Sequence, residues 1–304
     1  MENHNSKLWR QLSQELSEAI RRAGESIVSV MGHRGHASSG IVWRPDVVIT
    51  AAHAVRHDST LRVIGSSGDP VSARIAGRDH GSDIAVLQLN EGLSSPVAEF
   101  GETESAAVGE LVVAIARTRR GHIVASTGVI GGLMGEWRAW GVRRIDQFIR
   151  PDLTLLSGFS GGALIGADGR ILGMNTSALM RDKPITIPAA TLVRIGTDLA
   201  SKGRVPRPHI GVVMQPVHLP ESLQTRSGIA ASGGLLVMQT QPGGPADQAG
   251  VLIGDILVQW NGQGIGELEN LSDLVSGSGI GNEASLTLIR GGLKHELAVR
   301  VGER

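Results

Sequence analysis

The chain has 304 residues, which is enough for about two domains, and 41% of them are hydrophobic, which suffices for a core in each. Lys plus Arg and Asp plus Glu both total 29, so the net charge is zero, and the overall charge gives no support for nucleic acid or an anionic membrane as the main partner. The sequence contains no cysteine, so packing alone must hold the fold, and cysteine usage leaves the cellular compartment open.

Residues 1–25 predict an amphipathic amino-terminal helix. Apolar residues recur every four positions and form one stripe: Leu8, Leu12, Leu16 and Ile20. A stripe reports burial but not its partner, so packing on the same domain and self-association both stay open. This segment has no apolar run of the length that a signal peptide or a membrane span needs. We therefore expect a cytoplasmic protein, or a periplasmic or exported one if the chain is a processed form.

From Ile27 to about Ile187, short β-rich runs alternate with glycine-rich turns, a pattern that favours β-barrels over a βαβ sheet. A helix follows, and its apolar residues at helical spacing precede a glycine that predicts its end: Leu192, Ile195, Leu199 and Gly203. Residues 204–208 contain two prolines, whose fixed φ angles predict a short, stiff linker.

Residues 209–304 predict one small module of strands and helices. Strand-like runs cover 234–240 and 254–261, and the second run ends in an Asn-Gly turn. A short helix is expected at 245–250, because a proline stands at its start and a glycine at its end. The last predicted helix has its apolar residues on one face: Leu268, Leu271, Leu274 and Val275.

Three short segments in the first part of the chain supply a set of catalytic side chains. His53 ends an Ala-Ala-His run, Asp83 lies in Ser-Asp-Ile-Ala, and Ser160 lies in Gly-Phe-Ser-Gly-Gly. A serine hydroxyl becomes a nucleophile when an imidazole takes its proton, and a buried carboxylate fixes the tautomer of that imidazole. Glycines beside the serine allow backbone N–H groups to approach a developing oxyanion. In an α/β-hydrolase the acid and the histidine follow the serine, which is not the order here.

These segments resemble the HtrA (Deg) family of serine proteases, in which a trypsin-like domain precedes a PDZ domain. The resemblance covers roughly residues 26–300 and rests on several blocks in register: VVITAAHAV at 47–55, GSDIAVLQL at 81–89, SGFSGGAL at 157–164, GMNT at 173–176 and ITIP at 185–188. It implies a mainly β fold. A trypsin-like double β-barrel would span residues 26–203, and a small α+β PDZ domain would span residues 209–304.

The resemblance also implies the residues of the protease site. The catalytic residues would be His53, Asp83 and Ser160, with the amides of Gly158 and Ser160 forming the oxyanion hole. The substrate pocket would be built around Thr154, Leu155, Leu156, Asn175, Thr176, Ser177 and Ala178. No acid stands in those stretches, so small aliphatic residues are favoured over Lys or Arg before the scissile bond.

The implied partners are unfolded or misfolded proteins at the protease site and peptide C-termini at the PDZ domain. The loop made of His209, Ile210, Gly211 and Val212 would receive the terminal carboxylate of a peptide that adds a strand to the sheet edge. The family resemblance further implies a homo-oligomer, most simply a trimer. We therefore expect a serine endopeptidase, and the alternative is a catalytically silent peptide-binding or chaperone-like protein.

Phe159 and Ala163 depart from the family pattern, which has asparagine and proline at these positions. A bulky ring next to the nucleophile predicts an oxyanion hole that forms in only part of the population, and ordinary packing of the ring is the alternative. Because Phe159 lies next to the nucleophile, it is also the reason to keep the alternative of a catalytically silent peptide-binding or chaperone-like protein. His53 and His57 are four apart but lack the glutamate and the third ligand of a zinc site, so we expect no metal and no cofactor.

Overall fold

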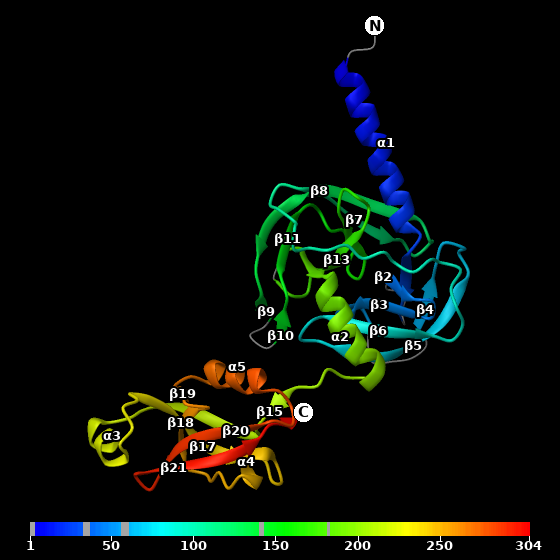
Figure 1. The fold of residues 1–304 in the computed structure, drawn as a ribbon. Coiled ribbons are helices and arrows are strands. Elements are labelled where there is room, and N and C mark those ends of the chain that lie inside the picture. The colour runs from blue at the N-terminus through cyan, green and yellow to red at the C-terminus, as the bar shows by residue number, and fades with distance from the viewer. Residues whose placement is uncertain (1–3, 33–36, 56–60, 140–142, 181–182) are drawn as a thin grey trace. The chain divides into compact units, whose positions relative to one another are not determined.

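The structure is a computed structural model, and it describes residues 4–32, 37–55, 61–139, 143–180 and 183–304. The chain forms two compact units, Met1–Val205 and Pro206–Arg304, which Figure 1 shows as ribbons. The boundary falls inside the predicted linker 204–208. Val205 packs against the core of the first unit, and the backbone of Arg207 exchanges hydrogen bonds of 3.1 and 2.9 Å with Arg304 in the second.

The first unit contains two closed antiparallel barrels, which confirms the predicted double-barrel, mainly β fold. Around the first barrel the strand order is β1-β2-β3-β6-β5-β4. Its strands are β1 (Ile27–Met31), β2 (Ala37–Arg44), β3 (Val47–Ala51), β4 (Leu61–Ile64), β5 (Pro70–Asp79) and β6 (Ile84–Leu89). Buried β-branched and leucine side chains from these strands fill the barrel, as their composition predicts.

The second barrel has the strand order β11-β14-β13-β12-β7-β8. Its strands are β7 (Leu111–Arg117), β8 (Ile123–Met134), β11 (Phe148–Asp152), β12 (Ala163–Ile165), β13 (Ile171–Thr176) and β14 (Ile185–Pro188). A separate two-stranded sheet consists of β9 (Trp137–Ala139) and β10 (Arg143–Ile145). One hydrophobic cluster contains residues of both barrels, for example Ile49 and Ile84 with Ile115 and Met174. This shared cluster fixes the position of one barrel relative to the other.

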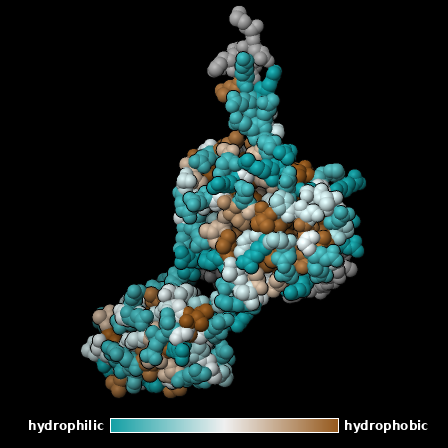
Figure 2. Space-filling view, turned by 45° about the vertical axis from the view of Figure 1, so that its right-hand side comes forward, coloured by the Kyte–Doolittle hydropathy of each residue, from teal (hydrophilic) through white to brown (hydrophobic). Residues whose placement is uncertain are grey.

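Two helices complete the first unit. Helix α1 (His4–Gly24) packs the inner half of its apolar stripe, including Leu16 and Ile20, against the shared cluster. The outer half stays exposed at Leu8, Trp9 and Leu12, and in Figure 2 the projecting part of α1 is mainly hydrophilic with a small hydrophobic patch. Helix α2 (Ala189–Lys202) buries the predicted apolar face and ends at Gly203, whose φ of +72° suits a glycine C-cap.

The second unit is built on one antiparallel sheet with the order β16-β17-β18-β20-β21. The strands of this sheet are β16 (Val212–His218), β17 (Gly233–Thr240), β18 (Ile256–Trp260), β20 (Glu283–Arg290) and β21 (Leu293–Arg300), and β19 (Gln263–Gly264) pairs with β18. In the same unit, β15 (Pro208–His209) and β22 (Gly302–Glu303) form a separate two-stranded sheet. Its helices are α3 (Glu221–Ser227), α4 (Pro245–Gln248) and α5 (Leu268–Ser278). Strand β16 is an edge strand of this sheet, and α5 lies beside it.

Candidate active site

The register between β3 and β6 brings His53 and Asp83 together. Ala51 pairs with Ile84, so the residues just beyond this pair lie side by side, and the Ala52 N–H donates to the Asp83 carbonyl at 3.0 Å. His53 sits in the short 3₁₀ turn η2 (Ala52–Ala54) that follows β3. Asp83 has φ +57°, a left-handed conformation that aspartate tolerates better than most residues do. Local backbone geometry therefore presents the two side chains to each other.

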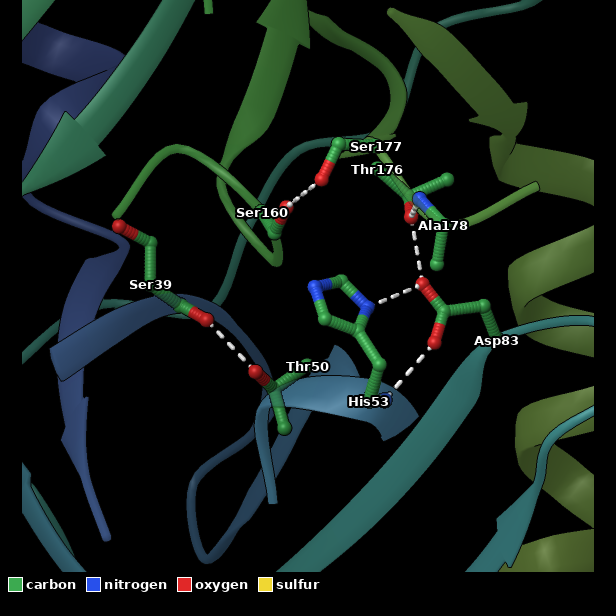
Figure 3. Close-up of polar contacts among 8 residues, drawn as sticks. All are labelled: Ser39, Thr50, His53, Asp83, Ser160, Thr176, Ser177 and Ala178. Carbon is green, nitrogen blue, oxygen red and sulfur yellow. Dashed lines mark hydrogen bonds and ion pairs between the residues drawn. The ribbon is translucent and has the colours of Figure 1, made fainter. Parts of the chain in front are cut away.

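The Asp83 carboxylate is buried and holds the histidine by two hydrogen bonds. One oxygen accepts the His53 backbone N–H at 2.8 Å, and the other accepts the ring Nδ1 at 2.8 Å, as Figure 3 shows. A carboxylate only accepts, so Nδ1 carries a proton and Nε2 is left as the basic nitrogen. The hydrogen bond to Asp83 raises the pKa of the His53 imidazole above its ordinary value, although partial burial acts in the opposite direction.

A residue of the second barrel supports the same carboxylate. The Thr176 hydroxyl, at the end of β13, donates a short hydrogen bond to the Asp83 oxygen that also accepts His53. The Ala178 N–H in turn donates to the Thr176 hydroxyl at 3.0 Å. Asp83 is thus held from both barrels, and its orientation depends on how they pack together.

Ser160 lies in the turn between β11 and β12, on the second barrel. Its hydroxyl is 3.2 Å from the Ser177 hydroxyl, and the structure gives it no hydrogen bond to the His53 ring. His53 nevertheless lies between Asp83 and Ser160 in Figure 3. The N–H groups of Gly158 and Ser160 donate to no acceptor within the described part of the chain. These two amides are therefore available to an oxyanion.

The turn between β11 and β12 (residues 153–162) carries Ser160 and is called the nucleophile turn here. It is packed from two sides. The Phe159 ring is 2% exposed and lies in the core of the second barrel. On the other side, an added Cβ at Gly161, which has φ +85°, would lie 2.0 Å from the Ser39 carbonyl oxygen of the first barrel. The buried ring agrees with ordinary packing, and partial formation of the oxyanion hole stays a prediction.

The residues of the predicted substrate pocket differ in exposure. Asn175 and Thr176 are completely buried, and the Asn175 side chain bonds to Ala163 and Thr186 in the second barrel. At these two positions only the backbone could therefore face a substrate, and the pocket stays a prediction. The remaining predicted residues are at least partly accessible: Thr154, Leu155, Leu156, Ser177 and Ala178.

In the second unit, the predicted carboxylate loop lies at one end of a groove between β16 and α5. The groove has a volume of about 440 Å³, and its apolar wall includes Met214, Leu271 and Val275. His209, Ile210, Gly211 and Val212 all line it. Gly211 has φ +74°, and the Ile210 and Gly211 N–H groups donate to no acceptor in the residues that the structure covers. Free amides at the end of an apolar groove suit a terminal carboxylate.

Sequence reasoning missed the buried polar residues that surround the site, among them Ser39 and Thr50. Both are fully buried within apolar strands, and this mismatch between residue type and strand pattern was the signal that could have found them. His57, the second member of the rejected metal pair, lies outside the described residues. Within the described ranges, no group of three or more metal-ligating side chains comes together.

The chain matches the models of two known domains. Residues 38–174 match the trypsin-like peptidase domain, and residues 208–301 match the PDZ domain. A candidate serine protease of Synechocystis sp. (strain ATCC 27184 / PCC 6803 / Kazusa), HhoB, is 30% identical over 279 residues, which are 88% of this chain and 67% of HhoB. A DegP-like serine endoprotease of Pseudomonas putida (strain GB-1) is 30% identical over 87% of this chain and 55% of its own length. The chain belongs to the HtrA family of serine endopeptidases.

Solved structures of this family share the fold. A serine endoprotease from Yersinia pestis has a TM-score of 0.72 at 24% identity, covering 95% of this chain and 97% of that chain. The HtrA-type protease AlgW with a decapeptide also has a TM-score of 0.72, at 21% identity, covering 95% of this chain and 98% of its own. At these identities, the two structures support the arrangement of elements and nothing finer.

The expected cytoplasmic location is wrong. The HtrA relatives from P. putida, Hahella chejuensis and Rhizobium meliloti are all named as periplasmic DegP-like proteases. The expectation rested only on the lack of an apolar run near residue 1. Among the described helices, none is long and apolar enough to cross a membrane.

Proposed function

We propose that this HtrA protein cleaves unfolded or misfolded proteins outside the cytoplasm, with Ser160 as nucleophile, His53 as general base and Asp83 as the orienting carboxylate. The observation that carries the proposal is the 2.8 Å contact between the buried Asp83 carboxylate and His53 Nδ1. It fixes the ring tautomer that a base facing Ser160 requires. The relatives named as periplasmic support a location outside the cytoplasm, and we propose the same location for this protein.

The chemistry follows from these positions. The Ser160 hydroxyl leaves Ser177, gives its proton to His53 Nε2, and attacks the peptide carbonyl carbon. The carbonyl oxygen becomes negatively charged and is held by the Gly158 and Ser160 N–H groups. His53 then protonates the leaving nitrogen, the C–N bond breaks, and an acyl ester remains on Ser160. Water attacks this ester by the same route and restores the hydroxyl.

For the substrate, we propose a small aliphatic residue before the scissile bond. Leu155, Leu156 and Ala178 are accessible apolar side chains close in sequence to the site, and the stretches 154–156 and 175–178 contain no acid to attract Lys or Arg. Peptide libraries that vary this one position test the preference. Fastest cleavage after arginine would contradict it.

Casein is the simplest substrate with which to test the activity. Wild-type protein should degrade it, and the Ser160→Ala variant should not, although both should unfold at the same temperature. Equal cleavage by both proteins would refute the role of Ser160. Binding of casein without cleavage by either protein would favour the silent, chaperone-like alternative.

We further propose that the second unit binds peptide C-termini, with the free amides of Ile210 and Gly211 receiving the carboxylate and β16 pairing with the peptide. A peptide that ends in valine should bind more tightly as the free acid than as the amide, because the amide lacks the charge. Fluorescence anisotropy of the labelled peptides measures this difference, and equal affinities would exclude this mode of binding. The trimer implied by the family is also proposed, with exposed Leu8, Trp9 and Leu12 on α1 as one contact surface, and light scattering tests it.

A further inference from the structure

Ser39 of β2, in the first barrel, makes two hydrogen bonds to the nucleophile turn of the second barrel. It is fully buried. Its N–H donates to the Ser160 carbonyl at 3.1 Å, and its hydroxyl donates to the Gly158 carbonyl at 2.8 Å. The same hydroxyl accepts the Arg117 N–H at 3.0 Å, and the Ser39 carbonyl accepts the Thr50 hydroxyl at 2.6 Å. Figure 3 shows Ser39 beside the turn that carries Ser160, with its carbonyl bonded to Thr50.

We propose that Ser39 is a positioning residue that holds the nucleophile turn in the conformation that leaves the Gly158 and Ser160 amides free for the oxyanion. This inference rests on the proposed function of those amides. It assigns to the first barrel, which supplies His53 and Asp83, a second role in shaping the oxyanion hole on the other barrel.

The backbone of the turn gives the first reason. The N–H groups of Phe159, Gly161 and Gly162 donate to carbonyls at 3.1, 2.9 and 2.9 Å, which leaves the amides of Gly158 and Ser160. Because a peptide unit is planar, fixing a carbonyl also fixes the next N–H. Ser39 fixes the carbonyls of both Gly158 and Ser160, so it restrains the two peptide units that follow these residues.

Gly158 is the residue that most needs such a restraint. It has φ +95°, and it lacks a side chain that would limit its rotation. Without the Ser39 hydroxyl, the peptide unit after Gly158 would keep one hydrogen bond, from the Phe159 N–H to Leu156. Rotation about Gly158 would then change the direction of its own N–H relative to the substrate carbonyl.

Arg117 explains why the Ser39 hydroxyl points in a single direction. A serine hydroxyl has one proton, and the Arg117 N–H occupies its acceptor side, so the proton is directed to Gly158. Arg117 cannot move easily, because its buried guanidinium donates to the carbonyls of Ile27, Gly121 and Gly24. The guanidinium contacts with α1, β1 and the β7–β8 turn thereby hold Arg117 in place, and with it the backbone N–H that donates to the Ser39 hydroxyl.

The neighbouring residue provides a matched control. Ser38 is also a buried serine on β2, but its hydroxyl has no hydrogen-bond partner among the residues described. Removing the Ser38 hydroxyl therefore deletes the same atom from the same strand without touching the turn. Ser39→Ala and Ser38→Ala should differ if the contact with Gly158 matters to catalysis.

The experiment compares wild type, Ser39→Ala and Ser38→Ala in the full chain. We expect Ser39→Ala to lower kcat about 10- to 100-fold with KM within about twofold, which approaches the loss of one oxyanion donor. A peptide aldehyde ending in valine forms a tetrahedral adduct that uses the same amides, so its affinity should fall by a similar factor. The downfield proton resonance of His53 Nδ1–H should stay in place, because its bond to Asp83 is untouched. Ser38→Ala should match wild type in all these measurements.

Equal kcat values for Ser39→Ala and Ser38→Ala would overturn the inference, as would a loss of kcat with unchanged aldehyde affinity. If Ser39→Ala does not fold, Thr50→Val removes the hydroxyl that holds the Ser39 carbonyl and should lower kcat and aldehyde affinity together, and failure to do so would equally overturn it. A wild-type protein that neither cleaves casein nor binds the aldehyde would instead refute the proposed function, and this inference with it.

Discussion

Replacing Gly161 by alanine should nearly abolish turnover while leaving the chain folded. The added Cβ would lie 2.0 Å from the Ser39 oxygen and 2.6 Å from the Thr50 hydroxyl, whereas ordinary contact begins at 3.4 Å. The turn would have to move by about 1.4 Å, and a displacement of about 1 Å at a reacting group costs on the order of 100-fold in rate. The φ of +85° adds strain of about 1 to 3 kcal/mol for any residue with a side chain.

Gly109→Ala is the matched control for this substitution. Gly109 has a similar φ of +95°, but nothing lies within 4 Å of the position its Cβ would take. It should therefore lose a comparable amount of stability in urea unfolding and keep the wild-type kcat on casein. If Gly161→Ala keeps at least a third of the wild-type kcat, or if both variants lose activity equally, the packing of the turn against Ser39 does not control catalysis.

Four further predictions concern charge and packing. Activity should fall as the pH drops through a midpoint above about 6.5, because Asp83 raises the pKa of His53 and a protonated ring cannot act as a base; a pH–rate profile with a lower midpoint would contradict this. The stability that the His53–Asp83 pair contributes depends on pH in the opposite direction. It is complete below the pKa that His53 has in the unfolded chain, and it is lost as the pH rises through the higher pKa that His53 has in the folded protein. Urea unfolding of wild type and Asp83→Asn across this pH range measures it. Phe159→Asn should cost about 3 to 5 kcal/mol, since it removes a ring that is 2% exposed, and unchanged urea unfolding would exclude a core role for the ring. Asp255→Asn should destabilise the second unit by about 2 to 3 kcal/mol, below the range for a fully buried pair because Arg290 is 32% exposed, and hydrogen exchange of residues 206–304 measures the effect.

The sequence predicts the elements well where local patterns decide them. Helix α2 ends at the expected Gly203, and the helix expected at 245–250 forms over Pro245–Gln248. His53 and Asp83 were assigned by family resemblance, and the register of β3 with β6 supplies the physical reason that they meet.

The burial of the expected pocket residues, and the residues that hold the catalytic site in place, could not be predicted from local sequence patterns. Strand β13 is buried along its whole length, because one face lies inside the second barrel and the other meets the shared cluster between barrels. The usual alternation of inner and outer residues is therefore absent, and Asn175 and Thr176 gave no sign of their burial. Ser39 and Gly158 are 119 positions apart, and no local period reports a contact of that kind.

The catalytic rate should depend strongly on how the two barrels are positioned relative to each other. Among the described residues, two sets of hydrogen bonds join the barrels at the site: Thr176 with Asp83, and Ser39 with both the nucleophile turn and Arg117. These hydrogen bonds break when one barrel shifts by about an ångström relative to the other, and such a shift leaves the closed sheet of each barrel intact. Substitutions in the shared cluster that shift one barrel against the other should therefore lower kcat before circular dichroism detects any loss of strands.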